Sequence, residues 1–205
     1  MAVLEILPLA FVMIAGPQIL SAVFLATSEN WRRNSAAFVT GSAVSISLLV
    51  TVAYFLGSGA NSQGTSNDTL LGVVLVLLLV AMVNTYRTRE ESEPPKWMGK
   101  LEKATPKFSF RLGFLLLGFF PTDIFTSVAV GSYLAGNDLP WTDFIPFILL
   151  TLLFLALPSL ILLAFGNRAE TFLPKARDWM NANSWVVNEI VLLFFIAMTL
   201  NNLFG

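Results

Sequence analysis

The sequence predicts an all-α integral membrane protein with six transmembrane helices, arranged as two inverted-topology three-helix repeats. The 205-residue chain is 56% hydrophobic and has a mean hydropathy of +0.73. Only 12% of its residues are charged, whereas soluble domains carry about 25%. The charges occur in blocks between apolar runs of about 20 residues, a length that crosses roughly 30 Å of hydrocarbon as a helix. The first and fourth runs also share a proline pattern, which indicates the repeat.

The apolar runs are continuous and rich in Leu, Val and Phe, which favours helices over the alternating strands of a barrel. We expect one transmembrane domain over residues 1–205, with repeat one at about 1–86, a cytoplasmic linker at about 87–111 and repeat two at about 112–205. No Lys or Arg precedes the first run, unlike a signal peptide, so we expect this run to be retained as a span. The predicted spans are Val3–Ala26, Ser35–Leu56, Thr69–Tyr86, Leu112–Leu134, Phe144–Phe165 and Trp185–Leu203.

The connections between these spans are polar. A loop rich in Gly and Ser, Gly57–Gly64, joins the second and third spans. In the linker, the stretch Trp97–Lys103 is either a short surface helix or a solvated segment. The tryptophans fall near predicted span ends, where an aromatic belt is expected: Trp31, Trp97, Trp141, Trp179 and Trp185.

The distribution of charge predicts the orientation. All twelve Lys and Arg residues lie in the first, third and fifth connections, together with seven of the acids, which gives these connections a net charge of +5. By the positive-inside rule, they face the cytoplasm and both termini are extracytoplasmic. We expect a multi-pass protein of the plasma membrane. The overall net charge of −1 suggests no nucleic-acid partner.

The absence of two residue types limits the chemistry. The chain has no Cys, which excludes disulfides and thiol redox chemistry, and no His, which removes the commonest metal ligand and general base. An aspartyl mechanism requires two acids that share a proton, and the predicted spans contain one deep acid, Asp123. We therefore expect no enzymatic activity, no cofactor and no bound metal.

A proline interrupts both the first and the fourth spans. Proline lacks an N–H and clashes with the carbonyl four residues earlier, so Pro17 and Pro121 should each break a helix. The half-helix that follows presents free N–H groups and a positive dipole end. Paired breaks of this kind point to a midplane binding site; the alternative is that they are tolerated kinks. The residues at the breaks are Gly16, Pro17 and Gln18 in the first span and Pro121, Thr122 and Asp123 in the fourth.

Asp123 is the acid placed deepest in a predicted span. An ionisable residue there is a functional hypothesis by default, and together with Thr122, Thr126 and Ser127 it forms a polar strip that could line a proton or cation path. The alternative is a structural role, in which Asp123 caps the free N–H groups of its half-helix. Gln18 is the matching polar residue of the first repeat.

Small residues are concentrated in the second span. They allow close helix packing and predict a central position for this span in the bundle. They are Ala36, Ala37, Gly41, Ser42, Ala43, Ser45 and Ser47.

Several short motifs together resemble the lysine-exporter superfamily, in particular its GAP branch, the sulfolipid- or peptidoglycolipid-addressing proteins. The resemblance covers nearly the whole chain and implies a six-helix inverted-repeat fold with a role in glycolipid export or addressing. That family often has an Asn-Pro pair in the fourth span, where this chain has Phe120-Pro121, so the cargo stays open. The motifs are Gly16-Pro17-Gln18, the stretch 29–38 before Gly41, Pro95–Met98, Leu157–Leu160, Arg168-Ala169-Glu170 and Trp179-Met180.

These observations favour a membrane transporter or exporter that moves a lipid or a small polar solute. The alternative is a scaffold or assembly factor for lipid export that does not itself transport. The expected partners are membrane lipids and a glycolipid or small-molecule cargo, and a homo-oligomer is left open.

The topology can be tested at the carboxyl terminus. A reporter fused after Gly205 should be active on the extracytoplasmic side, because six spans return the chain to the side where it began. A paired alkaline phosphatase and fluorescent-protein fusion would measure this. A cytoplasmic signal would contradict the predicted number of spans.

Overall fold

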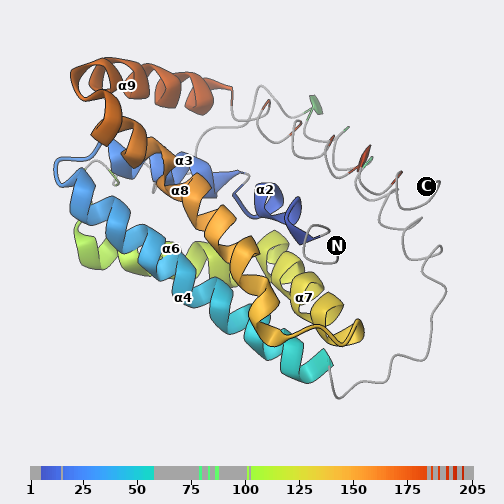
Figure 1. Ribbon diagram of the computed structural model, residues 1–205. Helices are drawn as coiled ribbons and strands as arrows, with labels where there is room; N and C mark the ends of the chain where they lie inside the picture. Colours follow the sequence, from blue (N-terminus) through green and yellow to red (C-terminus); the bar gives the residue numbers. More distant parts are fainter. Residues whose placement is uncertain are drawn as a thin grey trace. The chain divides into compact units, whose positions relative to one another are not determined.

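The computed structural model describes residues 6–14, 16–57, 101 and 103–183, with isolated positions between 79 and 87 and between 186 and 200. Every regular element in these ranges is helical (Figure 1). The chain divides into two compact units, one made of Met1–Asn61 and Pro95–Trp179, the other of Ser62–Pro94 and Met180–Gly205. The predicted third and sixth spans and most of the predicted Gly57–Gly64 loop and Trp97–Lys103 helix lie outside the described residues. The architecture below is that of the first unit.

The first predicted span is broken where its proline predicts a break. It consists of helix α2, Leu9–Ile14, and helix α3, Pro17–Ala26. Gly16 lies between them with φ 92° and ψ −136°, a backbone conformation that glycine adopts without a Cβ penalty. The ten residues of α3 rise only about 15 Å, roughly half the thickness of the hydrocarbon.

The fourth predicted span is also broken. Helix α6, Pro106–Phe119, and helix α7, Pro121–Gly136, meet at Phe120 with a bend of 66°. Phe120 is extended (φ −72°, ψ 130°), because the residue before a proline is disfavoured in helical conformation. The span starts earlier than the predicted Leu112, since Thr105 caps α6 by accepting a hydrogen bond from the Phe108 N–H (3.3 Å).

Two further helices match predicted spans closely. Helix α4 is Trp31–Gly57, and helix α8, Ile145–Phe165, follows a 3₁₀ turn η2 at Trp141–Phe144. Both are long and apolar enough to cross a membrane, and the bent α6–α7 pair qualifies as a third span if it is counted as one. The described residues thus hold two or three candidate spans, and the arrangement of six helices as an inverted repeat remains a prediction.

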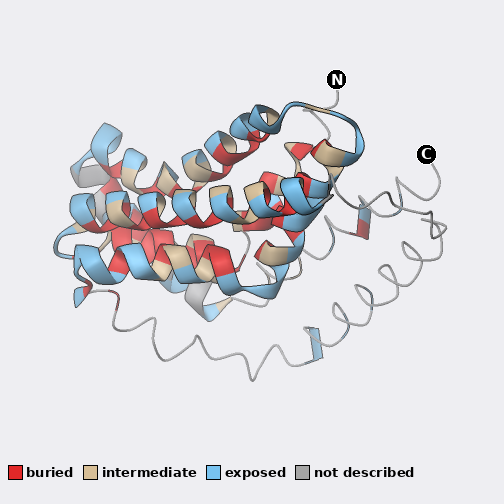
Figure 2. Cartoon of the chain, turned by 90° about the horizontal axis from the view of Figure 1, so that it is seen from below, coloured by how far each residue is buried: buried red, intermediate tan, exposed pale blue. Residues whose placement is uncertain are grey.

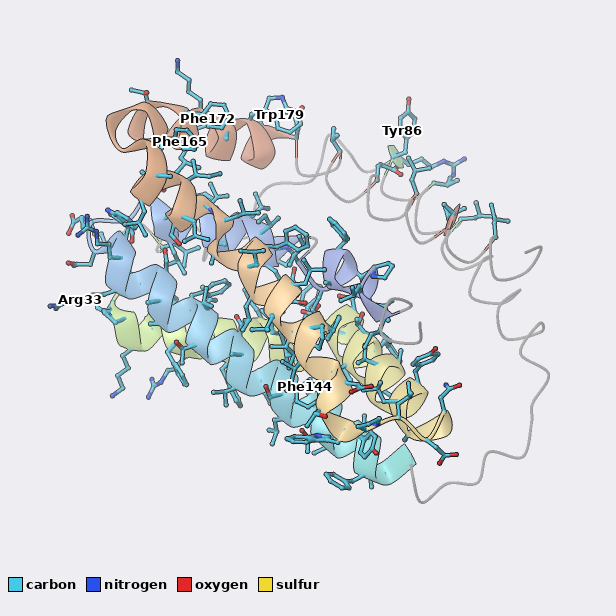
Figure 3. The ribbon with its side chains drawn as sticks, in the orientation of Figure 1. Arg33, Tyr86, Phe144, Phe165, Phe172 and Trp179 are labelled. Carbon is cyan, nitrogen blue, oxygen red and sulfur yellow. The ribbon has the colours of Figure 1, made fainter. Side chains whose placement is uncertain are left out.

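An additional helix occupies the fifth connection, for which the sequence analysis made no prediction of secondary structure. Helix α9, Asn167–Ala182, follows Gly166, whose φ of 48° ends α8. Figure 3 shows Phe172 and Trp179 on this helix, and both are exposed. Its buried side packs against α3 and α8, and the core there consists of Ala26, Leu162, Ala169 and Leu173. A spacing of four between Ala169 and Leu173 is the signal that could have identified the helix.

Helix α4 is central to this unit, as its small residues predict. It contacts α3, α6, α7 and α8, and Figure 1 shows it alongside α6 and α7. A Cβ added to Gly41 would lie 2.1 Å from the Phe110 carbonyl oxygen, and one added to Gly113 would lie 2.2 Å from that of Phe38. The backbones of α4 and α6 therefore touch at two reciprocal glycines. Figure 2 shows the buried residues facing inward between the helices.

Side-chain hydrogen bonds join α4 to neighbouring segments at both ends. Near its start, Asn34 Nδ2 donates to the Ala104 carbonyl oxygen (2.9 Å), just before α6. Near its end, the Tyr54 hydroxyl donates to the Leu139 carbonyl oxygen (3.0 Å) and Trp141 Nε1 donates to Thr51 Oγ1 (3.1 Å), both just after α7. Helix α4 therefore runs parallel to the α6–α7 pair.

The two ends joined by these hydrogen bonds differ in charge. The segments at the Asn34 end contain the cationic residues Arg32, Arg33, Lys103 and Lys107, whereas the segments at the Tyr54 end contain Asp138 and Asp143. This separation agrees with the prediction that the first and third connections lie on one side of the membrane. Which side faces the cytoplasm remains a prediction.

The glycine contact can be tested by adding a single methyl group. Gly41→Ala should lower the free energy of unfolding by about 1–3 kcal/mol, the usual cost of overpacking, because the clashing atom belongs to the backbone of α6. Thermal unfolding of the purified protein in mild detergent would measure this. Gly136→Ala is the control, since a Cβ there meets nothing within 4 Å. Equal melting temperatures for the two variants would contradict the close packing.

Candidate functional site

The two helix breaks meet at one buried hydrogen bond. Gln18 Nε2 donates to Asp123 Oδ2 at 2.5 Å, between residues 105 positions apart in the chain. Both side chains are 0% exposed. The two polar residues that the sequence analysis identified separately, one in each predicted repeat, are therefore in direct contact.

Helical geometry explains why these two residues face inward. Pro17 and Pro121 are the first residues of α3 and α7, so Gln18 and Asp123 each lie in the first turn of a half-helix. The buried residues of α7 recur at spacings of three and four, which places them on one face: Asp123, Thr126, Ser127, Val130, Gly131 and Leu134.

Asp123 does not cap its helix. The N-cap of α7 is Phe120, with no side-chain hydrogen bond to the cap, and the N–H groups of Asp123 and Ile124 both donate to the Phe120 carbonyl oxygen at 3.0 Å. The capping bond that the sequence analysis gave as the structural alternative is not observed, because Asp123 Oδ1 has no partner among the described residues and Oδ2 accepts from Gln18. The carboxyl group instead reaches across to α3, although its position in the first turn still favours negative charge through the helix dipole.

The remaining predicted residues divide into two groups. Thr126 and Ser127 are buried on the same face as Asp123, and Thr126 Oγ1 donates to the Thr122 carbonyl oxygen (2.7 Å). Pro121 and Thr122 are exposed. Thr122 therefore lies off the buried face that holds Asp123, because adjacent residues of a helix point about 100° apart, and its place in the predicted path stays a prediction.

Ser21 belongs to the same centre and was missed by sequence reasoning. It is 0% exposed, and its hydroxyl donates to the Pro17 carbonyl oxygen at 2.6 Å. Its hydroxyl is therefore bonded back within its own helix, to the carbonyl four residues earlier. Its spacing of three from Gln18, which places both on one face, is the signal that could have identified it.

The centre contains polar atoms without a partner. Asp123 Oδ1, Gln18 Oε1 and Ser127 Oγ are buried and have no hydrogen bond within the part of the chain that the structure describes. The prolines also free the carbonyls of Met13 and Leu117 from their usual helical partner, and both residues are fully buried. Each unsatisfied buried group costs about 1–3 kcal/mol. The free oxygens of this centre can therefore gain free energy by accepting hydrogen bonds from a ligand.

No cationic side chain lies near this carboxyl group among the described helices. Helices α2, α3, α7 and α8 contain no Lys or Arg, and the cations of α4 and α6 occur in the first two turns of those helices. Arg111 is the last of them along α6, and the helix from there to Phe119 rises about 12 Å. The centre is therefore polar and acidic within an otherwise apolar set of helices.

Residues 6–202 match the model of the family described as Sap, sulfolipid-1-addressing protein. The chain belongs to this family. The match covers both helix breaks and agrees with the branch that the sequence resembles. The wider placement in the lysine-exporter superfamily remains a prediction. Searches of curated proteins and of solved structures gave no match.

The contact between the breaks can be tested with a double-mutant cycle. Gln18→Leu should destabilise the protein by about 1–3 kcal/mol, because it leaves Asp123 Oδ2 unpaired as well. In an Asp123→Leu background the same change should cost less, and the coupling should be about 0.6–1.7 kcal/mol, as for other hydrogen bonds between membrane helices. Unfolding in detergent would measure both. An equal cost in the two backgrounds would contradict the contact.

Proposed function

We propose that this member of the sulfolipid-1-addressing family is a transporter that moves a lipid across or within the plasma membrane. The observation that carries the proposal is the buried contact between Gln18 and Asp123, which joins two half-helices that each begin at a proline. In secondary transporters, discontinuous helices place their free ends at the substrate or ion site near the membrane midplane.

The energetic cost of this centre supports a functional role. Two helix breaks, a buried carboxyl group and three unpartnered polar atoms all disfavour an apolar bundle. A protein that only needed to span the membrane would be more stable with unbroken helices. Costs of this kind are expected at functional sites and are offset elsewhere in the fold.

The order of the described helices supports the two-repeat arrangement. The broken pair α2–α3 is followed by the long helix α4, and the broken pair α6–α7 is followed by the long helix α8. We propose that each half ends with one more span, within Thr69–Tyr86 and Trp185–Leu203. An odd number of spans per half would give the halves opposite orientations, as in the lysine-exporter superfamily that the sequence resembles.

We propose an anionic glycolipid as the cargo. The family is described by reference to a sulfolipid, and a sulfate head group is an anion. The cationic residues at the Asn34 end of the bundle, Arg32, Arg33, Lys103 and Lys107, have the charge to attract such a head group at the membrane surface.

The same cationic end favours a second candidate function. Clustered Lys and Arg next to membrane helices hold anionic lipids or acidic partners without moving them. A scaffold or assembly factor for lipid export would need this end and would not need the Gln18–Asp123 centre. The two candidates therefore differ in which residues they require.

Lipid movement can be measured in proteoliposomes that contain a fluorescent sulfated glycolipid and are treated with an external quencher. The wild type should bring lipid from the inner leaflet to the quencher. Pro17→Ala combined with Asp123→Asn should slow this movement at least about tenfold, which corresponds to an activation free energy higher by about 1.4 kcal/mol. Asp138→Asn is the matched control, since that acid is exposed at the far end of α7.

The outcomes separate the two candidates. Unchanged movement in the double variant for every lipid tested would contradict a carrier site at the breaks. Retention of the sulfated lipid without movement in the wild type, lost when Arg32 and Arg33 are replaced, would favour the scaffold.

A further inference from the structure

The contact between Gln18 and Asp123 uses only half of the hydrogen-bonding groups available to it. A primary amide has a nitrogen that donates hydrogen bonds and an oxygen that accepts them, whereas both oxygens of an ionised carboxylate only accept. The amide nitrogen is satisfied, since Gln18 Nε2 donates to Asp123 Oδ2. The two remaining oxygens, Gln18 Oε1 and Asp123 Oδ1, are both acceptors, and neither has a partner among the described residues. Gln18 and Asp123 thus each keep one buried acceptor oxygen without a donor. One hydrogen shared by these two oxygens would satisfy both.

We propose that Asp123 carries a proton on Oδ1 in the conformation seen here and donates it to Gln18 Oε1. The two side chains then form a neutral acid–amide pair joined by two hydrogen bonds. This inference rests on the proposed function and deepens it, because it names the proton as the coupling ion of the transporter.

The surroundings of Asp123 support a neutral pair. An ionised carboxylate buried among apolar helices without a counter-ion is costly, and this cost outweighs the favourable contribution of the helix dipole at the start of α7. Helices α2, α3 and α8 contain no ionisable side chain, and α7 contains only Tyr133 besides Asp123. The elements packed against α7 carry a few such groups. Arg32, Arg33 and Tyr54 lie toward the ends of α4, Lys107 and Arg111 lie in the first two turns of α6, and Asp143 lies on η2.

A proton fits the unpartnered atoms better than a metal cation does. A metal cation would also neutralise the carboxylate, but it would need several oxygen ligands drawn together around it. A proton needs only Oδ1 and Oε1, which already belong to two groups in contact. Water could donate to these acceptors, but it would leave the negative charge in place.

Coupling follows from the dependence of the proton on the contact. When the two half-helices separate, Asp123 loses Gln18 and meets water, to which it releases the proton and becomes a carboxylate. It must take up a proton from water again before the pair can re-form. If the separated carboxylate is open to one side of the membrane when it releases its proton and to the other side when it takes one up, one proton crosses per cycle. Cargo movement is then linked to the proton gradient.

Infrared spectroscopy of the full-length protein in lipid tests the proton directly, without any cargo. At neutral pH the wild type should show the carbonyl-stretch band of a protonated carboxylic acid, which shifts in heavy water. The band should disappear in Asp123→Asn and persist in Asp138→Asn. Gln18→Leu should move it to higher frequency, because the acid loses its hydrogen-bond partner. Glu189 also has a buried side-chain oxygen, Oε1, without a partner among the described residues. A band lost in Glu189→Gln and unaffected by Asp123→Asn would therefore overturn the assignment, as would no band at all.

Stability gives a second readout. Asparagine is a neutral isostere of the protonated acid, since its Nδ2 can donate to Gln18 Oε1 while its Oδ1 accepts from Gln18 Nε2. Asp123→Asn should therefore melt at the wild-type temperature, whereas Asp123→Leu should melt lower. A melting temperature that rises in sodium chloride relative to choline chloride for the wild type, and not for Asp123→Asn, would overturn the proposal in favour of a metal cation.

The failure of this inference is distinguishable from the failure of the proposed function. A protonated Asp123 in a protein that moves no lipid would refute the transporter and retain the acid–amide pair. Lipid movement that requires Asp123, in a protein without the infrared band, would retain the transporter and refute the proton.

Discussion

Pro17 and Pro121 interrupt two apolar helices, and the backbone groups that they leave without partners must be satisfied inside the protein. The hydrogen bond between Gln18 and Asp123 joins the two interruptions. Much of the described structure follows from this constraint. Helices α2 and α3 are too short to be stable alone, and α6 and α7 diverge by 66°, so all four depend on packing against longer helices.

Helix α4 supplies that packing. Its small residues let its backbone touch that of α6 at Gly41 and Gly113, and hydrogen bonds from Asn34 and Tyr54 hold its two ends to the segments before α6 and after α7. Close backbone contact compensates for the weak hydrophobic driving force between helices in lipid. The bent pair is thereby supported on both sides of its break, which places Asp123 against α3.

A polar centre held in this way can have two states. With Gln18 and Asp123 in contact, one added proton satisfies both side chains and removes the buried charge. With the half-helices apart, the carboxyl group requires water. Membership of the sulfolipid-1-addressing family associates this centre with lipid export or addressing. Under the proposed function, the two states provide a means of linking lipid movement to an ion gradient.

The sequence by itself determined the features that depend on local chemistry. The positions of both helix breaks follow from the missing proline N–H, the segregation of charge can be read from the order of residues, and the close packing of α4 follows from side-chain size. Only the tertiary structure decided that Gln18 meets Asp123, that Thr122 points outward and that α9 is a helix packed on Ala26 and Leu162. The physical reason is that a helix break limits where the chain bends but not the direction of the bend. Contacts between residues 105 positions apart depend on how all the helices pack together.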